Sequence, residues 1–349
     1  MSVRAVVFDI GGTWFRSAVH TPAGRLEALS RRASINFHRH RDCSVAELQD
    51  RLVDYLAGEA RRLVREAGAD PIAVVSMGAA LNAHTGRVFG SGPLWGPASR
   101  PLDLPAALRR RAPELDWTVL NDLTAALLRH VHGAASRAHG RTALVTISSG
   151  IACRVYDHAR ACVPVEPTHG VQGEIGHLPV RCTFADTAIE LACDCGGRNH
   201  LAAFASGRGL AGLLATVAAL PGTGREASAL AGADPTAERL VDAARAGDAW
   251  SRSVLAAAMA PLADVLAVMW THDPELDPVL LVGGVAANLG ELLVEILCER
   301  LERHGLYAIT AHEPRFFRER LHLGCLDDDS GLLGCGAAAA ATARREASP

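Results

Sequence analysis

Short apolar runs alternate with stretches of helical periodicity along this chain. The runs are rich in β-branched and aromatic residues and are bounded by glycine, proline or polar residues, which is typical of buried strands. We expect strands at Val3–Ile10, Ser17–His20, Leu26–Ala33, Ile72–Met77, Trp117–Leu120, Thr142–Ser148, Ala152–Asp157 and Val279–Val282.

Between these runs, apolar residues recur at the spacing of one helix face. From Val45 to Ala67 the apolar positions share a face, and Gly68 follows as a C-cap. Further helices are expected at Leu123–His132, Leu201–Ala219, Ala237–Ala246, Ala249–Thr271, Ala286–His304 and Gly331–Arg345.

The alternation of strand clusters with helices predicts an α/β fold. The two halves open alike, with a strand, a turn of small residues and a second strand near Asp9 and again near Ser148. This repetition predicts a duplicated domain with a cleft between the copies. We expect a first domain over residues 1–121 and a larger one over 122–330, with the final helix, about 331–345, packing on the first.

Composition narrows the class of protein. The chain has 349 residues, of which 49% are hydrophobic and 21% charged, so it can bury a core. A net charge of −3 gives no overall case for a nucleic-acid or membrane partner. We expect no signal peptide, because Asp9 interrupts the early apolar stretch, and no apolar run long enough to span a membrane. Nine scattered cysteines fit a reducing cytosol.

The first candidate for chemistry is the turn Asp9-Ile10-Gly11-Gly12-Thr13. Glycines let backbone N–H groups approach a phosphate, and a threonine hydroxyl can add a further donor. The aspartate can hold Mg²⁺ through water. A strand followed by two glycines is also an ordinary hairpin.

Three further segments each have a chemical and a structural interpretation. Asn121-Asp122 follows a buried strand, and Asp122 is either the base that takes a proton from a substrate hydroxyl or the cap of the next helix. Ser148-Ser149-Gly150 is either a second phosphate-binding turn or a hairpin. Gly283-Gly284 either admits a nucleotide to a helix N-terminus or forms a tight strand–helix connection.

A fourth segment predicts a metal site. Cys193 and Cys195 are one residue apart, a glycine turn follows, and His200 comes five residues after the second cysteine. His177 supplies a fourth ligand, and two thiolates with two imidazoles suit a closed, structural Zn²⁺ site. Cys182 is a rival ligand, and a reduced cysteine pair in a loop is the alternative without metal.

Taken together and in this order, these motifs resemble the ROK family of sugar kinases and repressors, within the actin-like ATPase superfamily. The resemblance covers nearly the whole chain, and its most specific element is Gly173-Glu174-Ile175-Gly176-His177. It implies two actin-like, ribonuclease H-like domains and a homodimer.

The resemblance also implies a mechanism. ATP with Mg²⁺ lies on the turns at Gly11–Thr13 and Ser148–Gly150, with Gly283-Gly284 on the adenosine side. Asp122 takes the proton from a primary hydroxyl of the substrate. The candidate substrate-binding residues are Asn121, Glu174, His177, Ser91 and Asn82. Zinc fixes the loop that carries His177.

The chain departs from the family pattern on the sugar side. The third knuckle cysteine is His200, the second phosphate motif lacks its Gly-Thr-Gly sequence, Ala202 stands where the family often has a glutamate, and Ser91–Trp95 replaces Asn-Leu-Pro-Gly-Trp. A carbocyclic polyol has less need of the missing glutamate, because it has no hemiacetal oxygen. The chain is therefore similar to the kinases of C7-cyclitols of the valiolone or valienol type, and a kinase of glucose, another hexose or an N-acetylhexosamine is the alternative.

Two hypotheses from other classes are weaker. A repressor of this family carries a helix-turn-helix domain before the first motif, and only eight residues precede Asp9 here. A sugar-binding protein without activity would not need Asp122.

Overall fold

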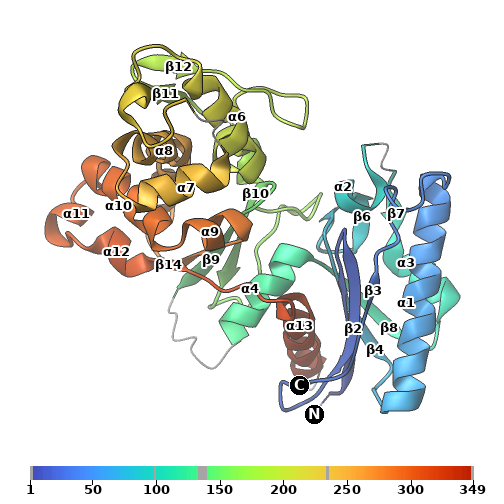
Figure 1. The fold of residues 1–349 in the computed structure, drawn as a ribbon. Coiled ribbons are helices and arrows are strands. Elements are labelled where there is room, and N and C mark those ends of the chain that lie inside the picture. Colours follow the sequence, from blue (N-terminus) through green and yellow to red (C-terminus); the bar gives the residue numbers. More distant parts are fainter. Residues whose placement is uncertain (1–2, 98–99, 133–139, 233–235, 347–349) are drawn as a thin grey trace. The chain divides into compact units, whose positions relative to one another are not determined.

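The computed structural model describes residues 3–97, 100–132, 140–232 and 236–346. The chain forms two compact units. Unit 1 comprises Met1–Arg137, Cys162–Gln172 and Leu326–Pro349, and unit 2 comprises Ala138–Ala161 and Gly173–Cys325. Figure 1 shows the elements of each unit.

Unit 1 is built on a five-stranded sheet with the order β3-β2-β1-β4-β8, in which β1, β4 and β8 are parallel and β2 and β3 antiparallel. A separate small sheet of β5, β6 and β7 comes between β4 and β8 in the sequence. The elements are β1 (Ala5–Ile10), β2 (Trp14–His20), β3 (Leu26–Ala33), α1 (Val45–Ala67), β4 (Ile72–Met77), β5 (Ala80–Leu81), β6 (Arg87–Gly90), α2 (Gly92–Trp95), β7 (Leu102–Asp103), α3 (Leu104–Arg111), β8 (Asp116–Asn121), α4 (Asp122–His132) and α13 (Ser330–Glu346).

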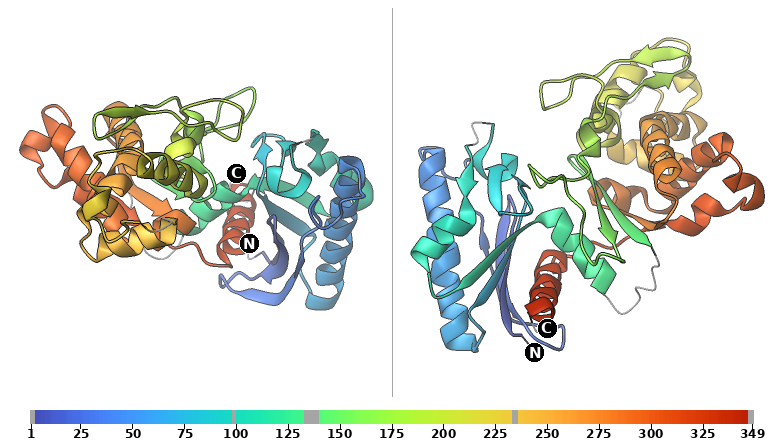
Figure 2. Two further views of the ribbon diagram at one scale, coloured as in Figure 1. Left: turned by 45° about the horizontal axis from the view of Figure 1, so that its top comes forward. Right: turned by 180° about the vertical axis from the view of Figure 1, so that it is seen from behind.

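Helices cover both faces of this sheet. Successive side chains of β1 point to opposite sides, so they enter two different cores. Val6 and Phe8 belong to a core shared with α1 and α3, whereas Val7 belongs to a core shared with α4 and α13. The views in Figure 2 show α13 lying along the strands that begin the chain. The first expected helix is confirmed, with a capping box at Ser44 and a left-handed Gly68 at its end.

Unit 2 has a sheet of order β10-β9-β13-β14, in which β9, β13 and β14 are parallel and β10 is antiparallel. The elements are β9 (Arg141–Ile147), β10 (Ile151–Asp157), the 3₁₀ turn η1 (Ile175–His177), β11 (Cys182–Phe184), β12 (Thr187–Ile189), α5 (Leu201–Ala205), α6 (Gly207–Ala218), η2 (Arg225–Ala227), α7 (Ala237–Arg245), α8 (Ala249–His272), β13 (Leu276–Val282), α9 (Gly284–Leu289), α10 (Glu291–His304), α11 (Ile309–His312), α12 (Phe316–Arg320) and β14 (Leu321–Leu323).

The two main sheets repeat one topology. Each begins with an antiparallel hairpin, β1–β2 or β9–β10, and continues from the first strand of that hairpin into two parallel strands. Unit 1 adds β3 at the outer edge. The expected α/β fold with a duplicated domain is confirmed by this common order.

Two expected helices are each interrupted. Ser206 caps α6 by accepting a hydrogen bond from the Gly209 N–H, so the stretch from Leu201 is split into α5 and α6. Gly290 adopts a φ of +57° and separates α9 from α10. Helical periodicity alone did not reveal these breaks, because the apolar spacing continues across both.

The division of the chain differs from the expected boundary after residue 121. Helix α4 follows β8 and packs on unit 1, where Ala125 shares a core with Leu332 and Cys335 of α13. Residues 162–172 also belong to unit 1, since the Ala83 N–H donates to the Gly170 carbonyl. Unit 1 is therefore assembled from three separate stretches of the chain.

Helix α8 corrects the expectation that no apolar segment reaches membrane-spanning length. By length and composition this helix of 24 residues could cross a membrane. In unit 2, however, α8 packs against α5, α6, α7 and α10, and Leu255, Leu262 and Leu266 are fully buried. Its apolar character is that of a core helix.

We predict that Gly334→Ala destabilises the protein although the residue lies within α13. A methyl group there would overlap the Ala125 carbonyl oxygen of α4. Alanine favours a helix interior over glycine by about 1 kcal/mol, but forced overpacking typically costs about 1–3 kcal/mol. Thermal unfolding should show a lower Tm than wild type. Thr342→Ala, at an exposed position of the same helix, is the control, and an unchanged or higher Tm for Gly334→Ala would contradict this packing.

Candidate active site

The predicted residues divide between the two units, and in each unit most of them lie at one edge of the sheet. In unit 1, Ile10 pairs with Met77 and Met77 with Asn121, so the carboxyl ends of β1, β4 and β8 are adjacent. The turn after β1 carries Gly11–Thr13, and Asp122 begins α4 directly after β8. Gly78 lies between them, and a Cβ at that position would be 3.3 Å from Oδ2 of Asp122.

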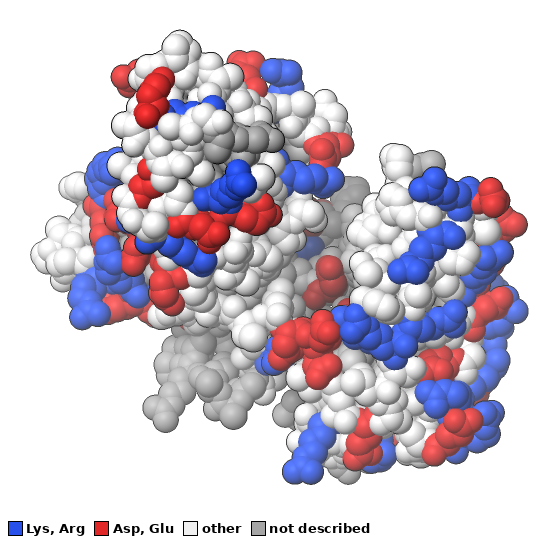
Figure 3. Space-filling model, viewed as in Figure 1, with Lys and Arg blue, Asp and Glu red and all other residues white. Residues whose placement is uncertain are grey.

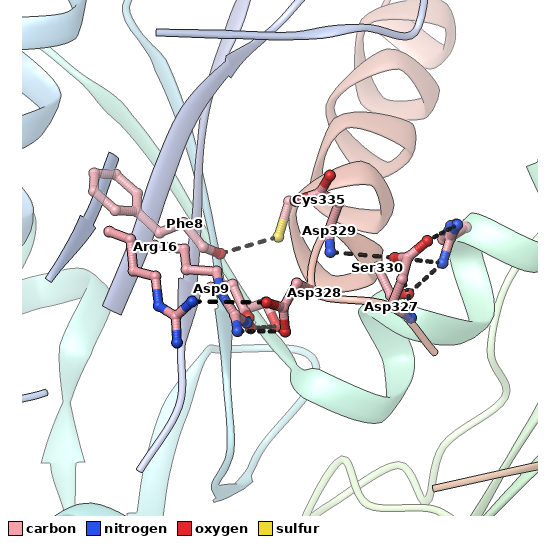
Figure 4. Close-up of polar contacts among 11 residues, drawn as sticks. Phe8, Asp9, Arg16, Asp327, Asp328, Asp329, Ser330 and Cys335 are labelled. Carbon is pink, nitrogen blue, oxygen red and sulfur yellow. Dashed lines mark hydrogen bonds and ion pairs between the residues drawn. The ribbon is translucent and has the colours of Figure 1, made fainter. Parts of the chain in front are cut away.

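Asp9 is held by a network that also fixes the start of α13 (Figure 4). Its Oδ2 lies 3.0 Å from Nη1 of Arg16, and its Oδ1 accepts a hydrogen bond of 3.3 Å from the Ser76 hydroxyl. Arg16 reaches on to Asp328 through Nη2, at 2.7 Å. A Cβ on Gly331 would lie 2.6 Å from Asp9 Oδ1, so only glycine allows α13 to approach so closely.

Burial raises the pKa of Asp9, and the adjacent Arg16 guanidinium lowers it in part. Desolvation disfavours a buried carboxylate, and a cation beside it compensates. The cation next to Asp9 in this structure is therefore a side chain. Mg²⁺ held through water at Asp9 would compete with Arg16 for the same oxygen.

The turn between β1 and β2 is compact. The Gly11 N–H donates to the Trp14 carbonyl over 3.0 Å, and the Gly12 carbonyl accepts from the Ser34 hydroxyl and the Asn36 amide. Thr13 is exposed. The turn thus has a hydrogen-bonded backbone with Thr13 exposed beside it, and its predicted contact with a phosphate stays a prediction.

Asn121 and Asp122 both accept a hydrogen bond from the N–H of Leu123, so the capping interpretation applies to the pair. The Asn121 amide also donates to the Ala79 carbonyl over 3.0 Å. The Asp122 side chain is exposed at the end of β8. Capping and proton acceptance are compatible here, because a carboxylate has two oxygens and several lone pairs.

Asn82 and Ser91 are buried and fix loops of unit 1. Oδ1 of Asn82 accepts from the N–H groups of His84 and Thr85, and its amide donates to the Thr168 carbonyl. The Ser91 hydroxyl donates to the Gly78 carbonyl over 2.8 Å. Their predicted substrate contacts stay predictions, and the bonds seen here position the polypeptide around the edge of the sheet.

In unit 2, the second predicted turn and the Gly283-Gly284 pair are neighbours. Val282 pairs with Thr146 across parallel strands, so the residues that follow β9 and β13 share one edge. Gly283 has a φ of +97°, and a Cβ there would lie 2.6 Å from the Ile147 carbonyl oxygen. Ser148 closes a hairpin through a 2.9 Å bond to the Gly150 carbonyl, and Ser149 is exposed. Ser148–Gly150 is therefore a hairpin turn, and Gly283-Gly284 is a tight strand–helix connection. These two segments, both predicted to bind the nucleotide, lie side by side.

The segment Gly173–His177 lies against the start of β10. The Cys153 N–H donates to the Gly173 carbonyl over 2.7 Å. A side chain on Gly173 would overlap the Cys153 carbonyl oxygen, and one on Gly176 would overlap that of Ile151. Glu174 and His177 are exposed at the two ends of this short turn.

The four predicted metal ligands come together. The ligand atoms of His177, Cys193, Cys195 and His200 all lie within 4.8 Å of one another, and Cys195 Sγ is 3.2 Å from His200 Nδ1. The knuckle is closed by the Gly196 N–H, which donates to the Cys193 carbonyl. This donor set fits tetrahedral Zn²⁺. The rival Cys182 is buried elsewhere, and its thiol donates to the Ala257 carbonyl of α8.

Sequence analysis missed two arginines. Asp9 and Arg16 are paired across the β1–β2 hairpin, and the register of that hairpin follows from its short turn. The expected hairpin therefore held the information needed to pair them. Arg154 on β10 contacts Glu174, which is twenty residues further along the chain, and no local pattern indicates that contact.

Comparisons with known proteins agree with one another. The model of the ROK family matches residues 5–342. The 2-epi-5-epi-valiolone 7-kinase of Actinoplanes sp. is 38% identical over 344 residues, covering 96% of this chain and 92% of that protein. The C(7)-cyclitol 7-kinase of Streptomyces hygroscopicus subsp. jinggangensis is 33% identical over 345 residues, covering 96% and 93%. The solved ROK hexokinase of Thermus thermophilus superimposes with a TM-score of 0.72 at 23% identity, over 99% of this chain and 100% of that one.

We predict that, in the absence of Mg²⁺, Arg16→Met destabilises the protein more at pH 8 than at pH 5. Loss of the guanidinium raises the folded-state pKa of Asp9 further above its unfolded value. Above that folded-state pKa, the folded chain must hold a buried carboxylate without this partner, whereas below it the group is neutral. The loss in the free energy of unfolding, measured with urea, should therefore grow by about 1 kcal/mol or more as pH rises.

The double variant Asp9→Asn/Arg16→Met is the matched control, because it has no carboxylate at this position. Its loss of stability should be nearly independent of pH. An equal loss for Arg16→Met at both pH values would contradict the coupling between these two side chains.

Proposed function

The chain belongs to the ROK family, and we propose that it phosphorylates the 7-hydroxyl of a C7-cyclitol of the valiolone type. It is an ATP-dependent kinase, as the family match and the kinases that cover 96% of the chain indicate. The observation that supports the substrate best is the identity of 38% over 344 residues to a valiolone 7-kinase.

The departures on the sugar side support the same substrate. Position 202, on α5, carries only a methyl group and offers no hydrogen bond to a hydroxyl at an anomeric centre. A site that demands a hydrogen bond rejects a ligand without the matching group, whereas an apolar side chain makes no such demand. A ring polyol without an anomeric carbon fits this position.

Asp122 is the proposed general base. Its exposed carboxylate takes the proton of the primary hydroxyl as that oxygen attacks the γ-phosphorus of ATP. The bond from the γ-phosphorus to the bridging oxygen breaks, and ADP leaves. Asn121, Glu174 and His177 hold the ring hydroxyls, so the primary carbon is the part presented for reaction.

The glycine turns support the binding of ATP. In the turns Gly11–Thr13 and Ser148–Gly150, the proposed donors to the phosphates are the hydroxyls and the N–H groups other than those of Gly11 and Ser148, which donate within their turns. Gly283-Gly284 is proposed to let the adenosine approach the backbone. When bound, Mg²⁺ neutralises charge on the phosphates. Asp9 is the proposed residue that holds it through water, with Arg16 as the side chain that it displaces.

Zinc is the proposed occupant of the Cys/His cluster. With four protein ligands it would be a closed structural site. Its role would be to hold His177 and the adjoining segment in place, with no part in activating water. The homodimer that the family resemblance implies and the cytoplasmic location that the nine scattered cysteines favour complete the proposal. A glucokinase is the less favoured alternative, since the family pattern for glucose is altered at Ala202 and Ser91–Trp95.

We predict that 2-epi-5-epi-valiolone is turned over with a higher kcat/KM than glucose, mannose or N-acetylglucosamine. One unmet hydrogen bond in a buried site commonly costs about 1–3 kcal/mol, which is about 5- to 150-fold in kcat/KM. A coupled assay of ADP release with each polyol measures this directly. A clear preference for glucose would reject the cyclitol proposal and leave the kinase activity intact.

We predict that Asp122→Asn lowers kcat by about 10²–10⁴-fold, because the amide keeps the shape but cannot accept the proton. The KM for the polyol should change little. Asp116→Asn, at the exposed start of β8, is the control and should keep wild-type activity. Near-wild-type kcat in a folded Asp122→Asn protein would exclude this residue as the base.

We predict one zinc per chain in gently purified protein, measured by elemental analysis. Cys195→Ser should lose the metal and lower the Tm, because a thiolate ligand is replaced by a poor one. Cys182→Ser should keep the metal, since its thiol faces α8. Absence of stoichiometric metal from the wild type, or its loss from Cys182→Ser, would be incompatible with the proposed ligand set.

A further inference from the structure

Arg154 is a buried cation in contact with a proposed substrate ligand. It lies on β10, and its side chain is 8% exposed. Its Nη2 lies 3.0 Å from Oε1 of Glu174, and its Nη1 donates to the Cys153 carbonyl over 2.8 Å. The opposing Glu174 side chain is 49% exposed, so the ion pair has one buried and one solvent-facing member.

The backbone around Glu174 is fixed independently of this ion pair. The segment from Gly173 to Gly176 lies flat on β10, because both glycines fit where a side chain would meet a carbonyl oxygen of that strand. The Glu174 carbonyl accepts the His177 N–H over 3.1 Å. The main chain therefore places Glu174, and one oxygen of its carboxylate contacts Arg154.

Burial of an arginine is unfavourable unless its charge is met by an anion and its N–H groups by acceptors. Here the guanidinium has both a carboxylate and a main-chain carbonyl. The contact with Glu174 is a single charge-assisted hydrogen bond from Nη2, and the guanidinium that donates it is itself fixed by burial and by the bond from Nη1 to the Cys153 carbonyl. One oxygen of Glu174 is engaged, and a half-exposed carboxylate retains acceptor positions for a further donor.

We propose that Arg154 is a positioning residue that orients Glu174 to accept a hydrogen bond from a ring hydroxyl of the polyol, a role that rests on the proposed function. A carboxylate held in its binding orientation loses less conformational freedom when the ligand arrives, so affinity improves. The two opposite charges also give the pair no net charge. The pair is therefore suited to a neutral polyol.

A purely structural role for the pair predicts different data. If Arg154 only stabilised unit 2, its replacement would lower the Tm or the fraction of active enzyme, and the KM for the polyol would stay the same. If it orients Glu174, the KM for the polyol rises while the KM for ATP and the kcat change little. The effect must also disappear once Glu174 can no longer act as the acceptor.

The test compares Arg154→Gln, Arg154→Lys, Glu174→Ala and the double variant Arg154→Gln/Glu174→Ala, with Arg160→Gln as a control at a position that is 71% exposed in the same unit. Steady-state kinetics give the KM for the polyol, the KM for ATP and kcat, and calorimetry gives polyol affinity without ATP. Arg154→Gln should raise the polyol KM and Kd by about 10-fold, near the lower limit for the loss of a hydrogen bond to a charged group, because the contact with the polyol itself remains. Arg154→Lys should show a smaller increase, and Arg160→Gln none.

The double variant decides between the two roles. If Arg154 acts through Glu174, the double variant should be no worse than Glu174→Ala alone. Independent, multiplying effects, or a folded Arg154→Gln protein with unchanged polyol KM and Kd, would overturn the proposal. If the wild type prefers a hexose to the cyclitol, the proposed substrate fails, and the same ratios measured with that hexose still decide the role of Arg154.

Discussion

Parallel pairing between strands far apart in the sequence is the constraint on which the placement of the candidate residues depends. Strands β1, β4 and β8 lie in register in unit 1, and β9 and β13 do so in unit 2. Parallel strands end at the same edge of a sheet, so the loops after them meet whatever their separation in the chain. Asp9, Asp122 and the segment after Gly11 are brought to one edge in this way, and Ser148 and Gly283 to another.

The glycines at these edges allow segments of the chain to approach one another closely. Gly331 lets α13 reach Asp9, Gly283 lets the end of β13 meet β9, and Gly173 lets the Glu174 segment lie on β10. Each position excludes a side chain because a carboxylate or a carbonyl oxygen lies within the reach of a Cβ. The glycine-rich turns thus have a structural function whether or not a nucleotide is bound.

The sequence predicted those parts of the fold that depend on local periodicity and on motif order. The strands of the first sheet, the long helix of unit 1 and the four residues of the Cys/His cluster were found from spacing and residue type. Helix breaks at Ser206 and Gly290 were not, because a serine or glycine within an apolar helical pattern is compatible with continuation. The return of residues 162–172 to unit 1 depends on hydrogen bonds to Asn82 and Ala83, which no local pattern specifies.

The predictions from sequence also lacked the arginines that compensate the charges of Asp9 and Glu174. The face shown in Figure 3 has acidic and basic side chains interspersed. The pairs at the site involve side chains that are partly or fully buried. Arg16 compensates Asp9 across a hairpin, and Arg154 meets Glu174 across a strand and the adjoining loop. The register of the hairpin could have indicated the first pair, whereas the second joins residues twenty positions apart and became visible only with the fold.

The position of the phosphate in the product is the sharpest test of the proposed phosphorylation at the 7-hydroxyl of a C7-cyclitol. The enzyme is incubated with ATP and 2-epi-5-epi-valiolone, and the product is examined by ³¹P and ¹³C NMR. We predict a monophosphate whose phosphorus couples to the methylene protons at C7, because the primary hydroxyl is the one that we propose Asp122 deprotonates. A phosphorus coupled to a ring methine, or no phosphorylated cyclitol under conditions that convert glucose to its 6-phosphate, would contradict it.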